Sequence, residues 1–439
     1  MTLHELPPPP EAVAATGRLA FIDAAAGVGA RLCRDALWDG ARCNWLGDAS
    51  EVVGSAWTVV HKAMGAELYD GTAGIALFLA RLHAATGERP FRTAAEGALR
   101  HVLSRRGQLG AAGRLAFHSG ATGVAWVLAE AGELLGSGEY ASAARELADE
   151  VAGLEPRPHE VDVISGAAGA IPALLDLAAR FGVEAWMGAA ARLGDFLLSI
   201  ARPGEAGTSW RTLEMDTRRD LTGYSHGASG VALALLELWR RTGEARFRAA
   251  AEEGFRYERS WFDPRQGNWP DFRTFESMGM PTPPEPGYAL AWCHGAPGIG
   301  MARIRAWQLT GDDVYRREAD AALRTTAYAL QAAAQAGSAG FSLCHGDAGN
   351  AELLILAEQA FGGGGAMQLA EQVGRMGIAR YLLPRAPWPC GVPDGGETPN
   401  LMLGLAGIGH FYLRLFDPAK VPSILLLAPR GAEAVVRTP

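Results

Sequence analysis

One short pattern, Gly-x-x-Gly, constrains the fold of this chain more than any other feature. Seven copies, 46 to 68 residues apart, each precede an apolar run of helical length. Internal periods of this size are typical of proteins built from repeated units. Small residues at a helix start also allow neighbouring helix ends to crowd together. The seven copies begin at Gly71, Gly120, Gly166, Gly227, Gly295, Gly346 and Gly404.

The sequence around these copies predicts two kinds of helix. The runs that follow the glycines are apolar on most sides, as for inner helices buried by neighbours on both flanks. The stretches between them are rich in Ala, Arg and Glu and read as amphipathic outer helices. An inner and an outer helix repeated seven times predict an all-α fold, an α/α toroid of seven inner and seven outer helices. The inner runs are 75–82, 124–135, 171–179, 231–239, 299–309, 351–360 and 408–415, and the outer stretches include 90–105, 139–154, 184–201, 244–257 and 313–335.

We expect residues 1–10 to form a flexible leader, because positions 7–10 are all proline and cannot continue a helix. Residues 11–439 are predicted to form a single toroid domain. A helix is expected over residues 11–38, with Gly27 and Gly29 as candidates to interrupt it. The proline-rich stretch at about 258–290 is expected to form a loop over one rim of the ring, and residues 423–427 to pack back on it.

Composition excludes several classes of function. The formal net charge is −8, and no cluster of Lys and Arg interleaves with aromatic residues, so nucleic acid is not expected as a partner. No segment approaches the roughly 18 apolar residues of a membrane span. Five cysteines suit metal binding or free thiols in a reducing compartment better than a disulfide framework. These features predict a cytoplasmic protein.

Cysteine and histidine gather just before the later turn glycines. If the seven turns surround one end of the ring axis, the side chains that precede them face a shared cavity. Cys293, Cys344 and His345 there offer two thiolates and an imidazole, which are normal zinc ligands, and leave a fourth position open. Two thiolates neutralise the charge of zinc, so a third, incoming thiolate would remain electron-rich. The set therefore predicts a zinc ion, Zn2+, that activates thiols.

Structural explanations compete with this one for each residue. A single buried cysteine is usually a small core residue, and a lone histidine more often forms a structural hydrogen bond. We favour that structural explanation for His118 and His410. An α/α-toroid carbohydrate enzyme is disfavoured, because this end of the axis offers thiols where such enzymes need paired carboxylates.

The motifs also resemble those of a known family. Tyr224-Ser225-His226-Gly227, Trp292-Cys293-His294-Gly295 and Cys344-His345-Gly346-Asp347, together with the seven turns, are similar to the lanthionine synthetase C-like (LanC-like) cyclases from about residue 30 to 428. The two Cys motifs and Asn268-Trp269 are most similar to the cyclase half of bifunctional lanthipeptide synthetases. A stand-alone cyclase and an excised domain both fit this resemblance.

The resemblance implies roles for further residues. His226 matches the family's catalytic histidine and is expected to transfer a proton, and Asp162 matches its active-site aspartate and is expected to orient or share that proton. His294 stands where relatives carry Tyr or His, so the match does not make it a ligand, and a hydrogen bond near the metal is expected of it. Stand-alone relatives often carry Arg where this chain has Ala289, and Arg273 on the rim loop is a speculative substitute.

The sequence thus predicts a zinc-dependent lanthipeptide cyclase. It would add peptide cysteine thiols to dehydroalanine or dehydrobutyrine and form lanthionine or methyllanthionine thioether rings, and its partners would be a dehydrated precursor peptide and a separate dehydratase. Two alternatives stay open. One is a LanC-like enzyme that adds glutathione or another free thiol to dehydroamino acids, and the other is a non-catalytic scaffold that binds a peptide in a biosynthetic complex.

Overall fold

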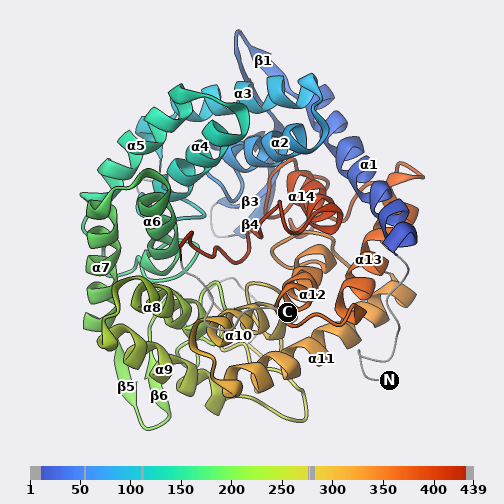
Figure 1. Ribbon diagram of the computed structural model, residues 1–439. Coiled ribbons are helices and arrows are strands. Elements are labelled where there is room, and N and C mark those ends of the chain that lie inside the picture. Colours follow the sequence, from blue (N-terminus) through green and yellow to red (C-terminus); the bar gives the residue numbers. More distant parts are fainter. Residues whose placement is uncertain are drawn as a thin grey trace.

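Two concentric rings of helices make up the protein (Figure 1). The computed structural model describes residues 11–53, 56–109, 113–274, 276, 282–337 and 339–431, so the expected leader at 1–10 lies outside it. The inner ring consists of α2 (Thr72–Thr86), α4 (Ala121–Leu135), α6 (Ala167–Phe181), α8 (Ala228–Thr242), α10 (Ala296–Thr310), α12 (Asp347–Phe361) and α14 (Leu405–Phe416). The outer ring consists of α1 (Glu11–Asp35), α3 (Arg89–Ser104), α5 (Gly138–Ala152), α7 (Glu184–Ser199), α9 (Ala245–Ser260), α11 (Asp313–Ala336) and α13 (Gly365–Gly377).

The inner ring is closed, because each inner helix packs against the next and α14 packs against α2. The outer ring uses the first helix of the chain as its seventh member. Helix α1 packs along α14, and the rings of Phe21 and Tyr412 stack there with centroids 6.3 Å apart. The predicted toroid of seven inner and seven outer helices is therefore confirmed.

Helix α1 is continuous, so the expectation that Gly27 and Gly29 interrupt it is wrong. A Cβ atom at Gly29 would lie 2.3 Å from Cδ2 of Leu82 on α2, so this glycine lets two helices approach each other. Helix α13 was not among the predicted outer stretches. It continues into a π-helical turn at Ile378–Leu382.

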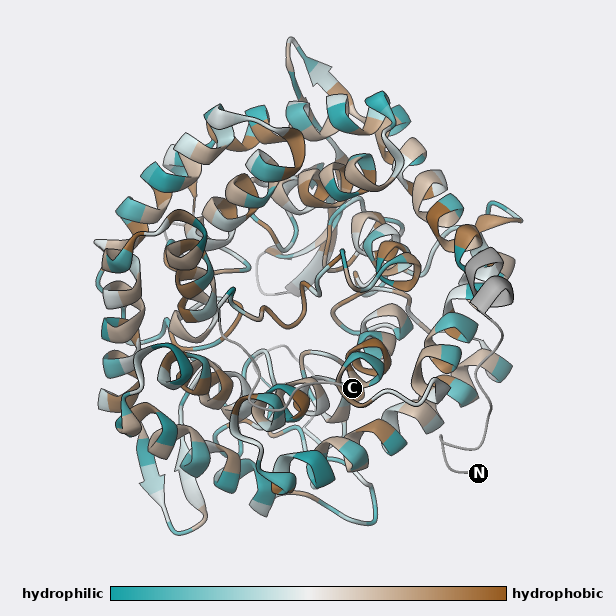
Figure 2. Cartoon of the chain, viewed as in Figure 1, coloured by the Kyte–Doolittle hydropathy of each residue, from teal (hydrophilic) through white to brown (hydrophobic). Residues whose placement is uncertain are grey.

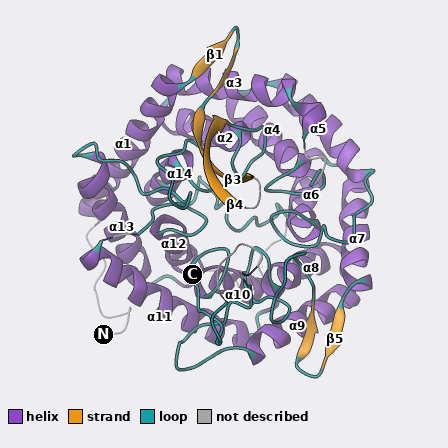
Figure 3. Cartoon of the chain, turned by 180° about the vertical axis from the view of Figure 1, so that it is seen from behind, coloured by secondary structure: helices purple, strands orange, loops and turns teal. Residues whose placement is uncertain are grey.

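Three antiparallel hairpins add strands that the helical periodicity did not predict: β1 (Leu37–Asp39) with β2 (Arg42–Asn44), β3 (Leu46–Val53) with β4 (Ala56–Ala63), and β5 (Arg202–Gly204) with β6 (Gly207–Ser209). The longest, β3–β4, places Leu46 opposite Ala63. Seen from behind, it reaches toward the middle of the ring on the face where the long loops gather (Figure 3). The valines of β3 and β4, with Trp57 and Thr58, are residues that favour strands.

The Gly-x-x-Gly turns begin the inner helices. The first glycine of every copy is the N-cap residue of an inner helix. A Cβ atom on the second glycine would lie only 1.7 to 2.3 Å from the carbonyl oxygen of the residue six positions earlier. Each preceding loop therefore folds back tightly over the first turn of its own helix. This close approach, repeated seven times, gathers seven loops on one face of the toroid.

Backbone hydrogen bonds join these loops in ring order. The donor and acceptor pairs are Tyr69 to His118, Ser119 to Ile164, Val163 to Ser225, Ser225 to Cys293, Cys344 to Met402 and Met402 to Tyr69. Within the described residues, no such bond joins the loop of Cys293 to that of Cys344. Cys293 and Cys344 therefore lie on neighbouring loops, at the one position in the ring where the described residues form no backbone hydrogen bond between adjacent loops.

The opposite face is covered by the segment that follows α14. This segment crosses the middle of the ring toward α6 (Figure 1), where the backbone N–H of Arg430 donates to Oδ1 of Asp176 at 3.0 Å. Ile424 and Leu425 are buried, and the Leu425 carbonyl accepts a hydrogen bond from Nε1 of Trp292 at 2.9 Å. Residues 423–427 therefore pack back on the toroid as expected.

The interior between the rings is mainly apolar, and polar residues gather on the outer edge (Figure 2). The inner helices nevertheless carry buried ion pairs to their neighbours. Arg305 on α10 binds Glu237 on α8 with an Nε–Oε1 distance of 2.6 Å, and Arg414 on α14 binds Glu352 on α12 at 3.1 Å. Removing one partner of such a pair would leave a buried charge, which costs about 3–5 kcal/mol. Among the described helices, none is both long and apolar enough to cross a bilayer.

Candidate active site

Two loops of the gathered face bring together the three residues predicted to bind metal. Cys293 lies in the loop before α10, and Cys344 and His345 lie in the loop before α12. One ligand atom from each of the three lies within 4.8 Å of the others. Cys344 is buried, Cys293 is half-buried and His345 is exposed, so the cluster is open to the loop face.

A backbone carbonyl fixes the orientation of the His345 ring. Nε2 of His345 donates to the carbonyl oxygen of Gly391 at 2.8 Å, which leaves Nδ1 as the ring nitrogen that can bind a cation. Metal-binding histidines commonly hold their second nitrogen in this way. A Cβ atom on Gly391 would lie 2.9 Å from Nε2 of His345, so the contact requires glycine. Sequence reasoning missed Gly391, which no motif connects to the cluster.

The protonation states of the Cys293 and Cys344 thiols depend on each other. A hydrogen bond from Cys344, together with nearby His345, holds the pKa of the Cys293 thiol well below its ordinary value. The same hydrogen bond and burial raise the pKa of Cys344. The pair therefore releases one proton readily and retains the second, and a divalent cation bound there would take the place of that second proton. Two thiols and an oriented imidazole fit zinc, with a fourth position left for a substrate.

Tyr69 supports the cluster from the first repeat. Its hydroxyl group shares a hydrogen bond with the Cys344 thiol. Burial raises the pKa of Tyr69 well above its usual value, so the phenol stays protonated. The sequence placed Tyr69 just before its turn glycine, but only ring closure brings this loop beside the sixth repeat.

His226 and Asp162 form a second group on the same face. Nδ1 of His226 lies 2.5 Å from Oδ2 of Asp162, which is 2% exposed. The other carboxylate oxygen accepts the backbone N–H of Ser165 at 2.6 Å. Burial by itself would lower the pKa of His226, but the Asp162 carboxylate overcomes this effect and raises it. The pair favours an imidazolium whose Nε2 is available for proton transfer.

His294 lies against His226 and outside the thiol cluster. The two imidazole rings stack with centroids 5.6 Å apart at an angle of 29°. His294 is 1% exposed, and neither of its ring nitrogens has a hydrogen-bond partner among the described residues. Burial lowers its pKa to about 4, so its ring is neutral at physiological pH.

The rim loop supplies a positive charge near these groups, although position 289 carries none. Nδ2 of Asn268 donates a hydrogen bond to the Ala289 carbonyl oxygen at 2.9 Å, which holds the turn at Gly295. Arg273 donates to both oxygens of Asp271, with an Nη2–Oδ2 distance of 2.6 Å. Its positive charge opposes the raised pKa values of His226 and His345.

The other two histidines weighed in the sequence are buried in the core. His118 packs against the ring of Trp292 with centroids 5.3 Å apart, and burial lowers its pKa to about 3. Nε2 of His410 lies 2.6 Å from Nη1 of Arg81 between inner helices. Both positions agree with the structural explanation.

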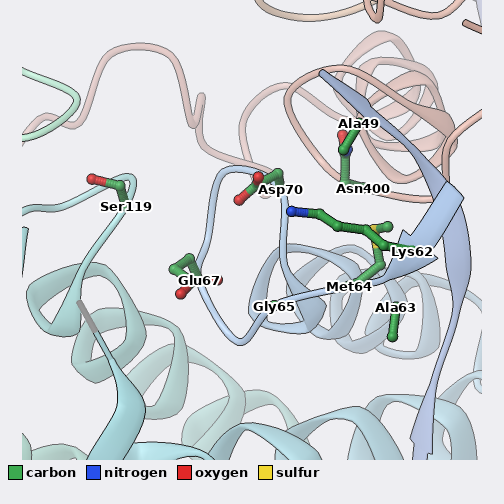
Figure 4. Close-up of a pocket in the computed structure, with 9 residues that line it drawn as sticks. All are labelled: Ala49, Lys62, Ala63, Met64, Gly65, Glu67, Asp70, Ser119 and Asn400. Atoms are coloured by element: carbon green, nitrogen blue, oxygen red, sulfur yellow. The ribbon is translucent and has the colours of Figure 1, made fainter. Parts of the chain in front are cut away.

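A cavity of about 400 Å3 adjoins the cluster on the side of the first, second and seventh repeats. Its polar lining consists of Lys62, Glu67, Asp70, Ser119 and Asn400. In Figure 4 the Lys62 ammonium group extends from β4 toward the carboxylate of Asp70. Asp70 directly follows Tyr69, the residue whose hydroxyl group shares a hydrogen bond with Cys344.

Comparison with known proteins places these features in a family. Residues 62–426 match the family described as lanthionine synthetase C-like protein. Among solved structures, nisin cyclase is similar with a TM-score of 0.64 and 17% identity, over 81% of this chain and 89% of that one. A GH76 α-mannanase of Bacteroides thetaiotaomicron has a TM-score of only 0.47 and 10% identity, over 92% and 96% of the two chains. The family match spans most of the chain and includes the thiol cluster and the His226–Asp162 pair. The chain therefore belongs to the lanthionine synthetase C-like family.

Proposed function

We propose that this chain is a zinc-dependent lanthipeptide cyclase. It would add the thiol of a peptide cysteine to the β-carbon of dehydroalanine or dehydrobutyrine and form a thioether ring. The observation that carries the proposal is the presence, on one face, of a two-thiol and imidazole cluster and a separate histidine–carboxylate pair. Thiol addition needs these two functions, thiol activation and proton delivery.

Cys293, Cys344 and His345 would hold the zinc ion. When bound, zinc supplies the positive charge that lowers the pKa of a cysteine thiol brought to it. The hydrogen bond from His345 to Gly391 keeps the imidazole in the tautomer that zinc binding needs. The Tyr69 hydroxyl is positioned to orient the Cys344 sulfur.

His226 would complete the reaction. Sulfur forms a bond with the β-carbon, and the electron pair of the double bond moves to the α-carbon and its carbonyl group. The protonated His226 then gives its Nε2 proton to the α-carbon. The substrate thiol loses its proton to solvent and His226 regains one from solvent, so no proton is gained or lost overall. Asp162 holds the ring by Nδ1 and stabilises its charged form. Nearby Arg273 adds positive charge while the substrate carbonyl is negative.

The substrate would be a dehydrated precursor peptide. Dehydroamino acids do not occur among genetically encoded residues, so a dehydratase must act on the peptide before this reaction. The name of the similar structure, nisin cyclase, agrees with a peptide-cyclising activity.

A cyclisation assay with defined peptides tests the proposal. The zinc-loaded protein is incubated with a synthetic peptide that carries one dehydroalanine and one cysteine. Ring closure leaves the mass unchanged, so the product is detected because it no longer reacts with N-ethylmaleimide. We expect closure by the natural chain, and we expect His226→Asn to retain zinc and lose closure.

The other two functions are outcomes of the same assay. A mass increase of one glutathione on a peptide without cysteine, and no ring closure, would identify an enzyme that adds free thiols. Absence of zinc from protein purified without chelators, with peptide binding but no reaction, would identify a scaffold. Either outcome would refute the cyclase.

A further inference from the structure

A second cavity, of about 430 Å3, lies on the loop face at the outer edge of the fourth repeat. It opens between β6, the last turn of α9 and the loop that leads to His226. Its lining includes four arginines and two aromatic residues, namely Arg202, Arg211, Arg218, Arg219, Tyr257 and Trp261. This concentration of arginine occurs in a chain whose formal net charge is −8.

Among the described residues, three of these four guanidinium groups have no acidic partner, and that of Arg218 donates to the backbone carbonyl oxygens of Pro283 and Pro284. Arg202 is paired with Asp220 at 3.2 Å. In contrast, Arg219 lies over the ring of Trp261 at 4.8 Å, and Arg211 donates only to backbone carbonyl oxygens at 3.4 and 3.5 Å. Within the described part of the chain, no carboxylate forms an ion pair with Arg211 or Arg219. Asp216 also lines the cavity, but it lies within ion-pair distance of neither.

The loop that lines this cavity also holds the catalytic histidine. The Thr212 hydroxyl donates to the His226 carbonyl, and Thr217 pairs with Arg273 of the rim loop. Seven residues separate Arg219 from His226, and a chain of that length spans at most about 25 Å. An extended peptide of roughly seven or eight residues could therefore reach from His226 to the arginines.

We propose that this cavity binds a carboxylate-rich segment of the peptide whose reacting residues occupy the active site. This inference rests on the proposed function for the identity of the peptide. Arginine presents a planar fork of donors that matches a carboxylate, and the exposed guanidinium of Arg219 is already held in place by Trp261. The cavity across the ring contains Glu67 and Asp70 with Lys62 as its one cation, so it offers an acidic segment no comparable excess of positive charge. The acidic segment thus has one favourable position, which sets the direction of the peptide across the face.

Fluorescence anisotropy with unreactive peptides tests the proposal. The probe is a fluorescein-labelled peptide in which alanine replaces the reacting cysteine and a Glu-Glu-Asp tract lies seven residues away. The matched peptide carries Gln-Gln-Asn instead. We expect the acidic peptide to bind more tightly, and Arg211→Ala or Arg219→Ala to weaken its binding about tenfold each, as for a lost charge-assisted hydrogen bond.

Two controls separate this site from general charge effects. Arg317→Ala removes an exposed arginine from α11 and should leave the affinity unchanged. Arg219→Lys keeps the positive charge but lacks the planar set of N–H donors of a guanidinium group. Its affinity for the acidic peptide should therefore lie between those of the natural chain and of Arg219→Ala. Thermal unfolding of each variant verifies that it is folded.

Equal binding of both peptides, or equal losses in Arg317→Ala and Arg211→Ala, would overturn the proposal. Displacement of the acidic peptide by a single-stranded oligonucleotide at lower concentration would also overturn it, because the cavity would then favour phosphate chains. The anisotropy measurement does not require the peptide to react. Arginine-dependent binding without any cyclisation would therefore reject the proposed function alone, and cyclisation without it would reject the docking site alone.

Discussion

The contact between Asp162 and His226 predicts how the reaction depends on pH. Asp162→Asn keeps the shape of the side chain and the acceptor for the Ser165 N–H, but it removes the negative charge beside Nδ1 of His226. In the natural chain this charge overcomes the effect of burial and raises the pKa of His226. The protonated donor is therefore present at low pH and is lost as the pH rises through that raised pKa.

The magnitude follows from the type of contact. A hydrogen bond to a charged group contributes about 1.5–3 kcal/mol, and one pKa unit corresponds to about 1.36 kcal/mol. Asp162→Asn should therefore move the alkaline limb of the kcat profile to lower pH by roughly one to two units. The contribution of the pair to folding stability has the same sign. It is present in full below the pKa of an unfolded histidine and disappears as the pH rises through the folded pKa.

The assay is the pH dependence of kcat for cyclisation of the dehydroalanine peptide, measured with protein of known zinc content. Asp162 is no member of the thiol cluster, so zinc content should stay unchanged in Asp162→Asn. An alkaline limb at the same pH in the natural chain and in folded, zinc-loaded Asp162→Asn would refute the reasoning, because His226 would then not be the proton donor controlled by this carboxylate.

Two further predictions concern the metal cluster and the helix starts. Cys344→Ala should abolish both activity and zinc retention, the latter measured by metal analysis. The control Cys33→Ala on α1 should change neither. Stoichiometric zinc in Cys344→Ala would disprove the assigned site. Gly349→Ala would place a Cβ atom 1.8 Å from the Leu343 carbonyl oxygen and should destabilise the fold by at least about 2 kcal/mol in denaturant unfolding. Gly188→Ala on α7 meets open space and should be neutral or stabilising by up to about 1 kcal/mol, and equal losses for the two glycines would contradict the steric argument.

The repeat architecture could be predicted from sequence because its cause is local. Each second turn glycine is required by a carbonyl group only six residues away, so the requirement is written within one short stretch and recurs seven times. The helical periodicity on either side supplied the inner and outer rings. It failed for the three hairpins, whose short strands lack a helical period, and for α13, which begins in a run of four glycines.

The candidate site could be predicted as a set of residues but not as a geometry. Cys293, Cys344 and His345 each lie one or two residues before a turn glycine, so their common face followed once the ring was assumed. The sequence did not predict the residues that orient these side chains. Gly391 fixes His345 from 46 residues away, and Tyr69 reaches Cys344 only because the first and last repeats meet.

The sequence by itself therefore determined the number of repeats and the helix starts, and it indicated the candidate metal ligands. The candidate acid–base residues His226 and Asp162 came from the family resemblance. The tertiary structure decided which nitrogen of His345 faces the thiols, that His294 stacks on His226, and that Arg273 rather than position 289 brings positive charge to the site. The physical reason is that steric needs of a turn act over a few residues. Contacts across the loop face depend on closure of the whole ring, which brings together residues that share no spacing in the chain.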